Sequence, residues 1–253
     1  MKIEYHKWWS PSLDQEMALK VYGFFGKPVL VFPAQGGRFY EFEDFGMLDA
    51  IAAFIEAGKI KVFTVDSFDD QSWSNSWAHP ADRAHRHEGY DRYVTQEVAP
   101  FIREHCGYSE QMILTTGVSM GAYHAANFFF RHPDLFDALI AISGLYRLNS
   151  FIGDYMDERV YINSPLDYLP NLEDPWYLER YRHSRVFIGV GQGAWEEPML
   201  HDTLAMKSIL ESKEIPAWID IWGYDVNHDW PWWRKMLPYF LGKMDLPGWS
   251  GHG

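Results

Sequence analysis

The stretch that decides the fold is ILTTGVSMGA, residues 113–122. Its first half is a short apolar run typical of a buried strand, and helical periodicity follows over Met120–Arg131. Between the two, Gly117 and Gly121 bracket Ser119 in the spacing G-x-S-x-G. A side chain at either glycine would collide with the neighbouring strand or helix. The pattern predicts a strand, a strained turn and a helix, with the Ser119 hydroxyl exposed at the turn and beside a helix N-terminus.

Outward from this elbow, apolar runs alternate with helical periodicity along the chain. The expected strands are Tyr5–Trp9, Met17–Gly23, Pro28–Phe32, Ile60–Val65, Gln111–Thr116, Leu135–Ser143, Arg185–Val190 and Ala217–Trp222. The expected helices are Met47–Ala57, Tyr90–His105 with a kink at Pro100, Met120–Arg131, Met199–Ser212 and Pro231–Leu241. The first two strands are joined by a Pro/Asp turn, which favours an antiparallel hairpin. We therefore expect an α/β fold with a mostly parallel central sheet of about eight strands, an antiparallel N-terminal hairpin and helices on both faces.

The sequence predicts a single domain over residues 1–245. Residues 144–182 lack steady periodicity and carry several Pro, Asp and aromatic residues, which indicates an insertion of short helices over the cleft. Residues 246–253 are expected to form a flexible tail. The segment Phe68–Asp82 is rich in Asp, Ser, Trp and Asn and is expected to be a loop.

Composition excludes several classes of protein. The 253 residues are 47% hydrophobic and 23% charged, which is typical of a globular chain rather than a disordered one. A formal net charge of -13 disfavours nucleic acid as a partner. The single cysteine, Cys106, allows neither an internal disulfide nor a thiol metal cluster. Neither a signal peptide nor an apolar run long enough to span a membrane is recognised, so a cytoplasmic location without membrane contact is expected.

A serine hydroxyl needs a base to take its proton. In folds that use the G-x-S-x-G elbow, the chain order is serine, acid, histidine, with the histidine after the last strand. His228 lies in the loop after Ala217–Trp222 and is the expected base. His201 falls inside a predicted helix, and His252 falls in the tail. His124, about one and a half turns after Ser119, is expected to be a packed helix residue.

The imidazole must be held in one tautomer by a carboxylate, which belongs in the loop after strand Arg185–Val190. Two adjacent glutamates there compete, Glu196 and Glu197, and neighbouring loop residues point in different directions. We favour Glu197 and keep Glu196 open. Asp202 is a third candidate, disfavoured because it should lie in the following helix.

The oxyanion of the reaction needs two N–H donors. One is expected from Met120, the residue after the nucleophile, and the second from the loop after Pro28–Phe32. That loop contains Gln35, Gly36 and Gly37, and a glycine lets a backbone N–H turn into the cleft. We favour Gly37, with Gly36 and Gln35 as alternatives.

Substrate contacts are expected from residues that follow strands or flank these loops. Asp66 ends a predicted strand, and aromatic side chains beside the loops could form a wall for an acyl or aryl group. The candidates for substrate binding are Asp66, Trp73, Trp195 and Trp230. The cluster of His79, His85 and His87 with nearby acids matches no metal spacing and is interpreted as a solvated polar loop, so no metal is expected.

Taken together, these motifs resemble the putative esterase family of α/β-hydrolases, which groups esterase D, enterochelin esterase, feruloyl esterases and mycolyltransferases. The resemblance is carried by the opening hairpin, the loop 32–40, Gly117–Gly121, Trp195–Met199 and His228-Asp229-Trp230. The Glu-Pro-Met run is similar to the acid loop of enterochelin esterases, which favours Glu197. An extra residue after Gly193 keeps Glu196 open, and the oxyanion loop lacks the Asp-Gly or His-Gly of many relatives.

The resemblance implies a serine esterase with a Ser-Glu-His triad and an acyl-enzyme intermediate, acting on a small-molecule ester without metal or organic cofactor. An acyltransferase of the same fold is the alternative, and a non-catalytic binding member of the fold is a second one. Relatives are often dimers, so a homodimer is possible on this basis.

Overall fold

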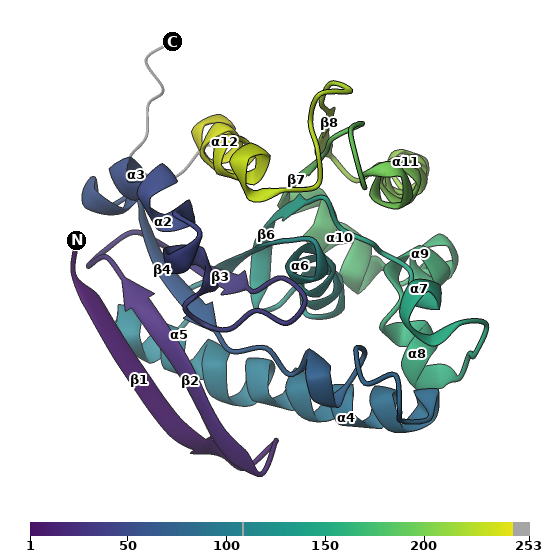
Figure 1. The fold of residues 1–253 in the computed structure, drawn as a ribbon, viewed down its shortest axis with the longest axis horizontal. Helices are drawn as coiled ribbons and strands as arrows, with labels where there is room; N and C mark the ends of the chain where they lie inside the picture. Colours follow the sequence, from purple (N-terminus) through teal and green to yellow (C-terminus); the bar gives the residue numbers. More distant parts are fainter. Residues whose placement is uncertain (108, 245–253) are drawn as a thin grey trace.

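The computed structural model describes residues 1–107 and 109–244, and the predicted tail at 246–253 lies outside them. Its centre is one eight-stranded sheet in the order β1-β2-β4-β3-β5-β6-β7-β8 (Figure 1). The strands are β1 (Ile3–Ser10), β2 (Gln15–Tyr22), β3 (Lys27–Phe32), β4 (Ile60–Val65), β5 (Ile113–Val118), β6 (Phe136–Ile142), β7 (Arg185–Val190) and β8 (Ala217–Ile221). The predicted sheet is confirmed. Its central strands are short apolar runs whose residues are buried on both faces of the sheet.

The direction of the strands sets where functional loops can meet. Strands β1 and β2 form the predicted antiparallel hairpin, and β2 pairs antiparallel with β4. All remaining pairs, from β4 through β3, β5, β6 and β7 to β8, are parallel. The carboxyl ends of β3, β5, β6, β7 and β8 therefore lie along one edge, where ligands bind in open parallel sheets.

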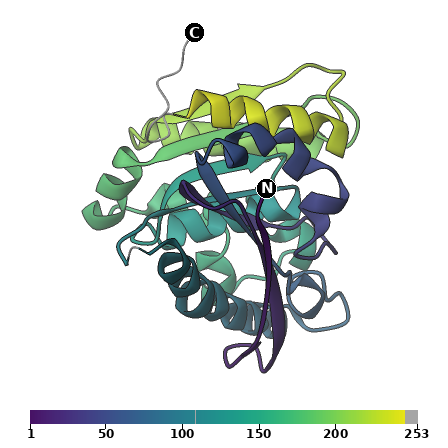
Figure 2. The ribbon, with the colours of Figure 1, turned by 90° about the vertical axis from the view of Figure 1, so that its left-hand side faces the viewer.

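Helices cover both faces of the sheet (Figure 2). One face carries α4 (Pro80–Tyr93), α5 (Ala99–Cys106), α6 (Met120–Arg131), α10 (Pro175–His183) and α11 (Glu197–Ser212), whose apolar side chains share a core cluster with the strands. The other face carries α1 (Glu41–Asp44), α2 (Met47–Ala50), α3 (Ala52–Glu56) and α12 (Trp230–Lys243). The sheet is thus packed between two buried apolar layers, which fix the positions of the loops at its carboxyl edge.

Two predicted helices differ from those observed. The helix expected at Tyr90 begins at Pro80, because His79 caps it by accepting the Ala81 N–H at 3.2 Å. A π segment, Val94–Val98, lies between α4 and α5 and comes just before Pro100, which lacks the N–H that regular helical bonding needs. The helix expected over 47–57 is divided at Ile51 into α2 and α3.

Residues 144–182 consist mainly of short helices, namely α7 (Asn149–Ile152), α8 (Glu158–Ile162), α9 (Pro165–Tyr168), the 3-10 turn η3 (Leu169–Asn171) and α10. Leu148, Ile152 and Val160 from this segment share a buried cluster with Met120, the first residue of α6. The segment is therefore packed against the helix that begins at the elbow. Within the described part of the chain, no helix is long and apolar enough to cross a membrane.

Candidate active site

The elbow after β5 has the conformation that its glycines require. Ser119 has φ 56° and ψ -121°, a region that non-glycine residues rarely adopt. A Cβ atom at Gly117 would lie 2.3 Å from the backbone carbon of Gly121. A Cβ at Gly121 would lie 2.2 Å from the carbonyl oxygen of Phe32. Both positions exclude a side chain, and the strain at Ser119 is held by the close packing of β5, α6 and β3.

Three side chains from distant loops meet at this point. The Ser119 Oγ lies 2.9 Å from Nε2 of His228. The other ring nitrogen of His228, Nδ1, lies 3.3 Å from Oε2 of Glu196. The loops that carry them follow β5, β8 and β7, so the parallel sheet brings together residues 32 and 109 positions apart in sequence.

The carboxylate beside the histidine belongs to Glu196, the alternative that the sequence kept open, and not to Glu197, which the sequence favoured. Trp195, directly before Glu196, adopts a left-handed conformation with φ 68°. Glu196 is fully buried, whereas Glu197 begins α11 and is exposed. An exposed carboxylate in the first turn of a helix complements the helix dipole, which accounts for Glu197. Asp202 lies in α11, as expected, and accepts the N–H of Tyr146 at 2.8 Å.

The loops of the acid and of the histidine are tied together by their backbones. The Gly193 N–H donates to the Val226 carbonyl at 2.8 Å, and the His228 N–H donates to the Ala194 carbonyl at 3.0 Å. The Asn227 side chain accepts the Ala194 N–H at 2.8 Å. A Cβ atom at Gly193 would lie 2.3 Å from Oδ1 of Asn227, so the two loops can approach only over a glycine.

Sequence reasoning missed two residues that hold the acid. The Ser143 hydroxyl, at the end of β6, donates to Oε1 of Glu196 at 2.6 Å. The Trp233 indole N–H donates to the Ser143 oxygen at 3.1 Å, and its ring packs edge-on to the His228 ring at 4.9 Å. A usable signal existed, because Ser143 directly follows an apolar strand as Ser119 does. Every polar atom of the buried carboxylate thus has a partner, as burial of a charge requires.

The backbone N–H groups expected to bind the oxyanion are those of Met120 and of the loop after β3. Met120 is the first residue of α6, so its N–H has no partner within the helix. The Gly37 N–H, which the sequence favoured, donates to the Ala34 carbonyl at 2.9 Å and so is already used within the loop. The hydrogen bonds of the described residues leave the N–H groups of Gln35 and Gly36 unused, and both were alternatives.

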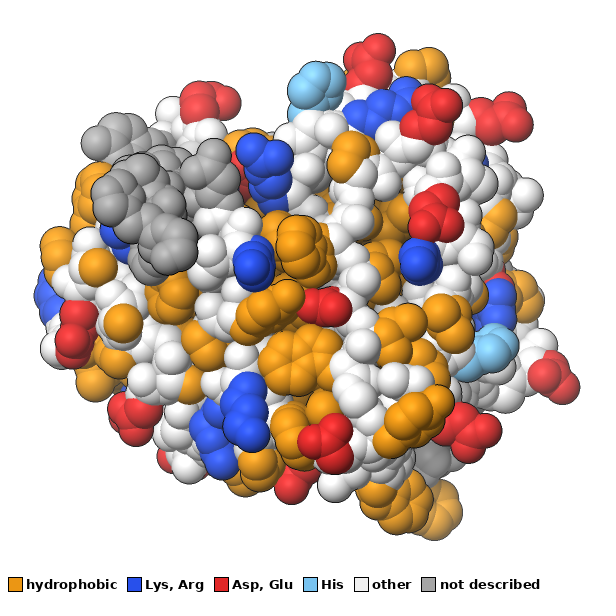
Figure 3. Space-filling model, turned by 90° about the horizontal axis from the view of Figure 1, so that it is seen from above, with side chains coloured by type: hydrophobic (Ala, Val, Ile, Leu, Met, Phe, Trp, Pro, Cys, Tyr) orange, Lys and Arg blue, Asp and Glu red, His pale blue; other side chains and the backbone are white. Residues whose placement is uncertain are grey.

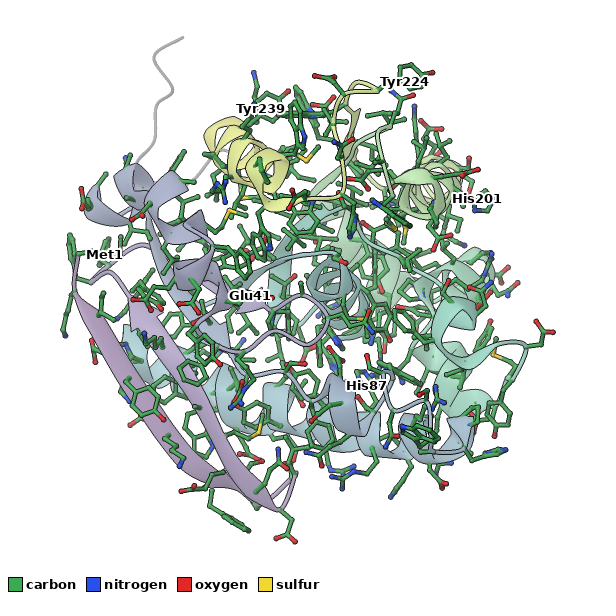
Figure 4. All side chains as sticks on the ribbon, viewed as in Figure 1. Met1, Glu41, His87, His201, Tyr224 and Tyr239 are labelled. Carbon is green, nitrogen blue, oxygen red and sulfur yellow. The ribbon has the colours of Figure 1, made fainter. Side chains whose placement is uncertain are left out.

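The loop that carries these donors is anchored by a buried carboxyl group. Glu41 of α1 accepts the Ala34 N–H at 2.8 Å and lies directly against Gly37, where a Cβ atom would be 2.2 Å from Oε1. Burial raises the pKa of Glu41 to about 7. Figure 4 places Glu41 in the middle of the molecule, beside the loop that follows β3.

The candidate substrate residues are in very different surroundings. Asp66 is buried and accepts from Nε and Nη2 of Arg38 at 2.5 and 2.8 Å, so it anchors the loop, and its contact with substrate stays a prediction. Trp73 is fully buried in the cluster with Met120 and Leu148, so its surroundings do not support the predicted substrate contact. Trp195 is 84% exposed, and Trp230 is half-buried and stacked on Phe45 at 4.5 Å. Seen from above, hydrophobic side chains interrupt the charged surface at this end of the molecule (Figure 3).

Among the described residues, the other histidines singled out in the sequence contact groups other than Ser119. His124 is buried and its Nε2 lies 2.7 Å from Oδ1 of Asp69, so it is a packed helix residue. His201 lies on α11 and points away from the sheet (Figure 4). His79 caps α4, and His85 and His87 lie on that helix, so the cluster is not a loop as predicted; His79 and His85 are exposed, whereas His87 is fully buried. His252 lies outside the described residues.

A serine, a histidine and a buried carboxylate in hydrogen-bonded order can pass the serine proton to the imidazole. The unpaired N–H at the start of α6 can stabilise negative charge that develops beside Ser119. This arrangement at the carboxyl edge of a mostly parallel sheet defines the class of α/β-hydrolases.

Comparison with known protein families identifies the family within this class. A family model described as putative esterase matches residues 10–244, most of the chain. The chain therefore belongs to the putative esterase family, and it is an ester hydrolase. No curated protein matches the chain.

Solved structures with the same fold cover almost all of the chain. A ferulic acid esterase has 18% identity and a TM-score of 0.74, over 95% of this chain and 96% of its own. The S-formylglutathione hydrolase of Agrobacterium tumefaciens has 14% identity and a TM-score of 0.72, over 94% and 92%. MPT51 (FbpC1) of Mycobacterium tuberculosis has 14% identity and a TM-score of 0.72, over 96% and 97%. At these identities the likeness establishes the fold.

Proposed function

We propose that this protein is a serine esterase that hydrolyses a carboxylic ester through an acyl-enzyme intermediate. Ser119 is the nucleophile, His228 is the general base, and Glu196 is the acid that orients the imidazole. The observation that carries the proposal is the 2.9 Å distance between the Ser119 Oγ and Nε2 of His228, with Glu196 on the opposite ring nitrogen. A serine becomes a strong nucleophile only when such a base takes its proton.

The reaction has two halves. His228 accepts the Ser119 proton as the oxygen attacks the ester carbonyl, and the oxyanion is stabilised by the Met120 N–H and by a second N–H. We assign the second donor to Gln35, the first residue with an unused N–H after the Phe32–Pro33 backbone that packs on Gly121. The alcohol leaves with the proton from His228, and water then releases the acid by the same route.

Replacing Ser119 with alanine tests the assignment. We expect hydrolysis of p-nitrophenyl acetate to fall by about 10⁴-fold or more, because loss of the nucleophile leaves only transition-state binding. The exposed Ser208 of α11 provides the control, and Ser208→Ala should retain full activity. Far-ultraviolet circular dichroism would verify that both variants are folded. Activity of the Ser119→Ala protein equal to that of the Ser208→Ala protein would exclude the mechanism.

Two further assays separate the proposed activity from its relatives within the fold. A fluorophosphonate probe should label the native protein and not the Ser119→Ala variant, because only an activated serine reacts; a binding protein without catalysis would stay unlabelled. Adding an alcohol to the ester assay distinguishes hydrolysis, which yields the free acid, from acyl transfer, which yields a new ester.

A further inference from the structure

Three side chains with metal-binding atoms meet far from Ser119, at the outer edge of the sheet. Glu4 and His6 lie on β1, two residues apart, so strand alternation places both side chains on the same face. His105 reaches them from the last turn of α5. Figure 1 shows β1 at one side of the molecule with α5 beside it, well separated from the start of α6.

The distances between the three groups fit a small tetrahedral metal ion. Nε2 of His105 lies 3.2 Å from Oε2 of Glu4, and Nε2 of His6 lies 3.5 Å from the same oxygen. The three ligand atoms all lie within 4.8 Å of one another. Tetrahedral Zn²⁺ has bonds of about 2.0–2.2 Å, which sets its ligand atoms roughly 3.3–3.6 Å apart. Two of the three separations therefore need almost no adjustment.

The two imidazole rings are held in place by packing. The His6 ring lies edge-on to Phe101 at 4.9 Å, and the His105 ring lies edge-on to Phe63 at 5.6 Å. Nε2 of His6 is buried and makes no hydrogen bond to any described residue. Its contact with Oε2 of Glu4 at 3.5 Å is too long for a good hydrogen bond, so this buried nitrogen can still take a ligand beyond the protein itself.

We propose that Glu4, His6 and His105 bind one Zn²⁺ ion, which clamps the edge strand β1 to helix α5. Two imidazoles and a carboxylate favour zinc over Mg²⁺ and Ca²⁺, which prefer oxygen ligands. The fourth position is left for water. Because β1 pairs with β2 alone, such a clamp gives the edge strand a second attachment.

Two lysines contact the proposed ligand residues: Lys61 donates to the backbone carbonyl of His105 at 3.2 Å, and Lys2 pairs with the carboxylate itself. Nζ of Lys2 lies 2.8 Å from Oε1 of Glu4, the carboxylate oxygen that faces away from the histidines. The Lys2 side chain is exposed and can turn into solvent. Its removal should therefore strengthen metal binding, an effect opposite in sign to removal of a ligand.

Titration of the untagged, metal-stripped protein with ZnCl₂ in a calorimeter tests the site. We expect one Zn²⁺ per chain at this site and a rise in melting temperature that MgCl₂ does not produce. His6→Ala and Glu4→Gln should each weaken binding by about tenfold or more. Lys2→Ala should tighten it. His85→Ala is the control, because His85 forms an exposed pair with Glu88 on α4 and should change nothing.

A second measurement does not depend on the folding of the variants. Co²⁺ bound to the native protein should give the intense visible absorption of tetrahedral cobalt, and Zn²⁺ should displace it. Absence of that absorption, or Zn²⁺ affinity that is the same in the His6→Ala and His85→Ala proteins, would overturn the proposal. Ester hydrolysis is assayed separately and is expected to be independent of this ion.

Discussion

Replacing Glu41 with glutamine is expected to stabilise the protein at pH 8 and to change it little at pH 5. Glu41 is only 8% exposed, and it keeps the loop after β3 in place through the Ala34 N–H. Desolvation of the carboxylate raises its pKa from 4.5 to about 7, against the smaller effect of the Ala34 hydrogen bond, which lowers it. The amide oxygen of glutamine can accept the same N–H without carrying a charge.

The direction of the change in stability with pH follows from proton binding to Glu41. Between about pH 4.5 and pH 7 the folded protein keeps the Glu41 proton while the unfolded chain releases it, so stability falls as pH rises through this window. Below the window the contribution of this proton is fully present, and above it the contribution is lost. A pKa raised from 4.5 to about 7 corresponds to about 3 kcal/mol for the ionised group. Glutamine removes this cost only where the carboxylate would be ionised.

Urea unfolding followed by tryptophan fluorescence at pH 5 and pH 8 measures the effect. The gain in unfolding free energy of Glu41→Gln over the native protein should be about 2–3 kcal/mol larger at pH 8 than at pH 5. Glu43, in the same helix, is the matched control. It is exposed and paired with Lys20, which lowers its pKa, so Glu43→Gln should lose a small stabilising contribution as pH rises. A stability difference for Glu41→Gln that does not change with pH would refute the reasoning.

Three further predictions concern the active site. Glu196→Gln should lower kcat for p-nitrophenyl acetate by about 10³-fold or more, whereas Glu197→Gln should stay within about threefold of the native rate, and steady-state kinetics of the pair would reverse our choice of Glu196 if the losses were exchanged. Ser143→Ala removes the hydroxyl that donates to Glu196 at 2.6 Å and should cost about 1–3 kcal/mol in thermal unfolding together with a lower kcat. Gly121→Ala would place a Cβ atom 2.2 Å from the Phe32 oxygen, so labelling by a fluorophosphonate probe and thermal stability should both fall; an alanine variant with native labelling would contradict the required close packing.

Much of the fold is visible in the sequence because it rests on apolar runs. Helix α6 and strands β4 and β7 have the predicted bounds, since each is a continuous apolar or periodic segment between turn residues. The first ten residues of α4, 80–89, were missed for the opposite reason. Its buried side includes Arg83 and His87, which have no apolar periodicity, and only their tertiary contacts make this face internal.

The choice of acid could not be made from the sequence, because the backbone conformation of this loop is not visible there. Trp195 has φ 68°, a conformation usually associated with glycine or asparagine and not indicated by a tryptophan. The family resemblance pointed to the loop that lies beside His228, and of its two neighbouring carboxylates the structure brings Glu196 to the imidazole.

The loops that carry Glu196 and His228 are joined by contacts that do not involve either of these two side chains. The loop after β7 and the loop after β8 share the Gly193 to Val226 hydrogen bond and the contact between Ala194 and Asn227. These contacts place Glu196 beside His228 even if one of the two side chains is changed. Conservative substitutions of Ser119, His228 or Glu196 should therefore leave the fold intact and change only proton transfer. Kinetic measurements on such variants can then be interpreted as effects on the reaction.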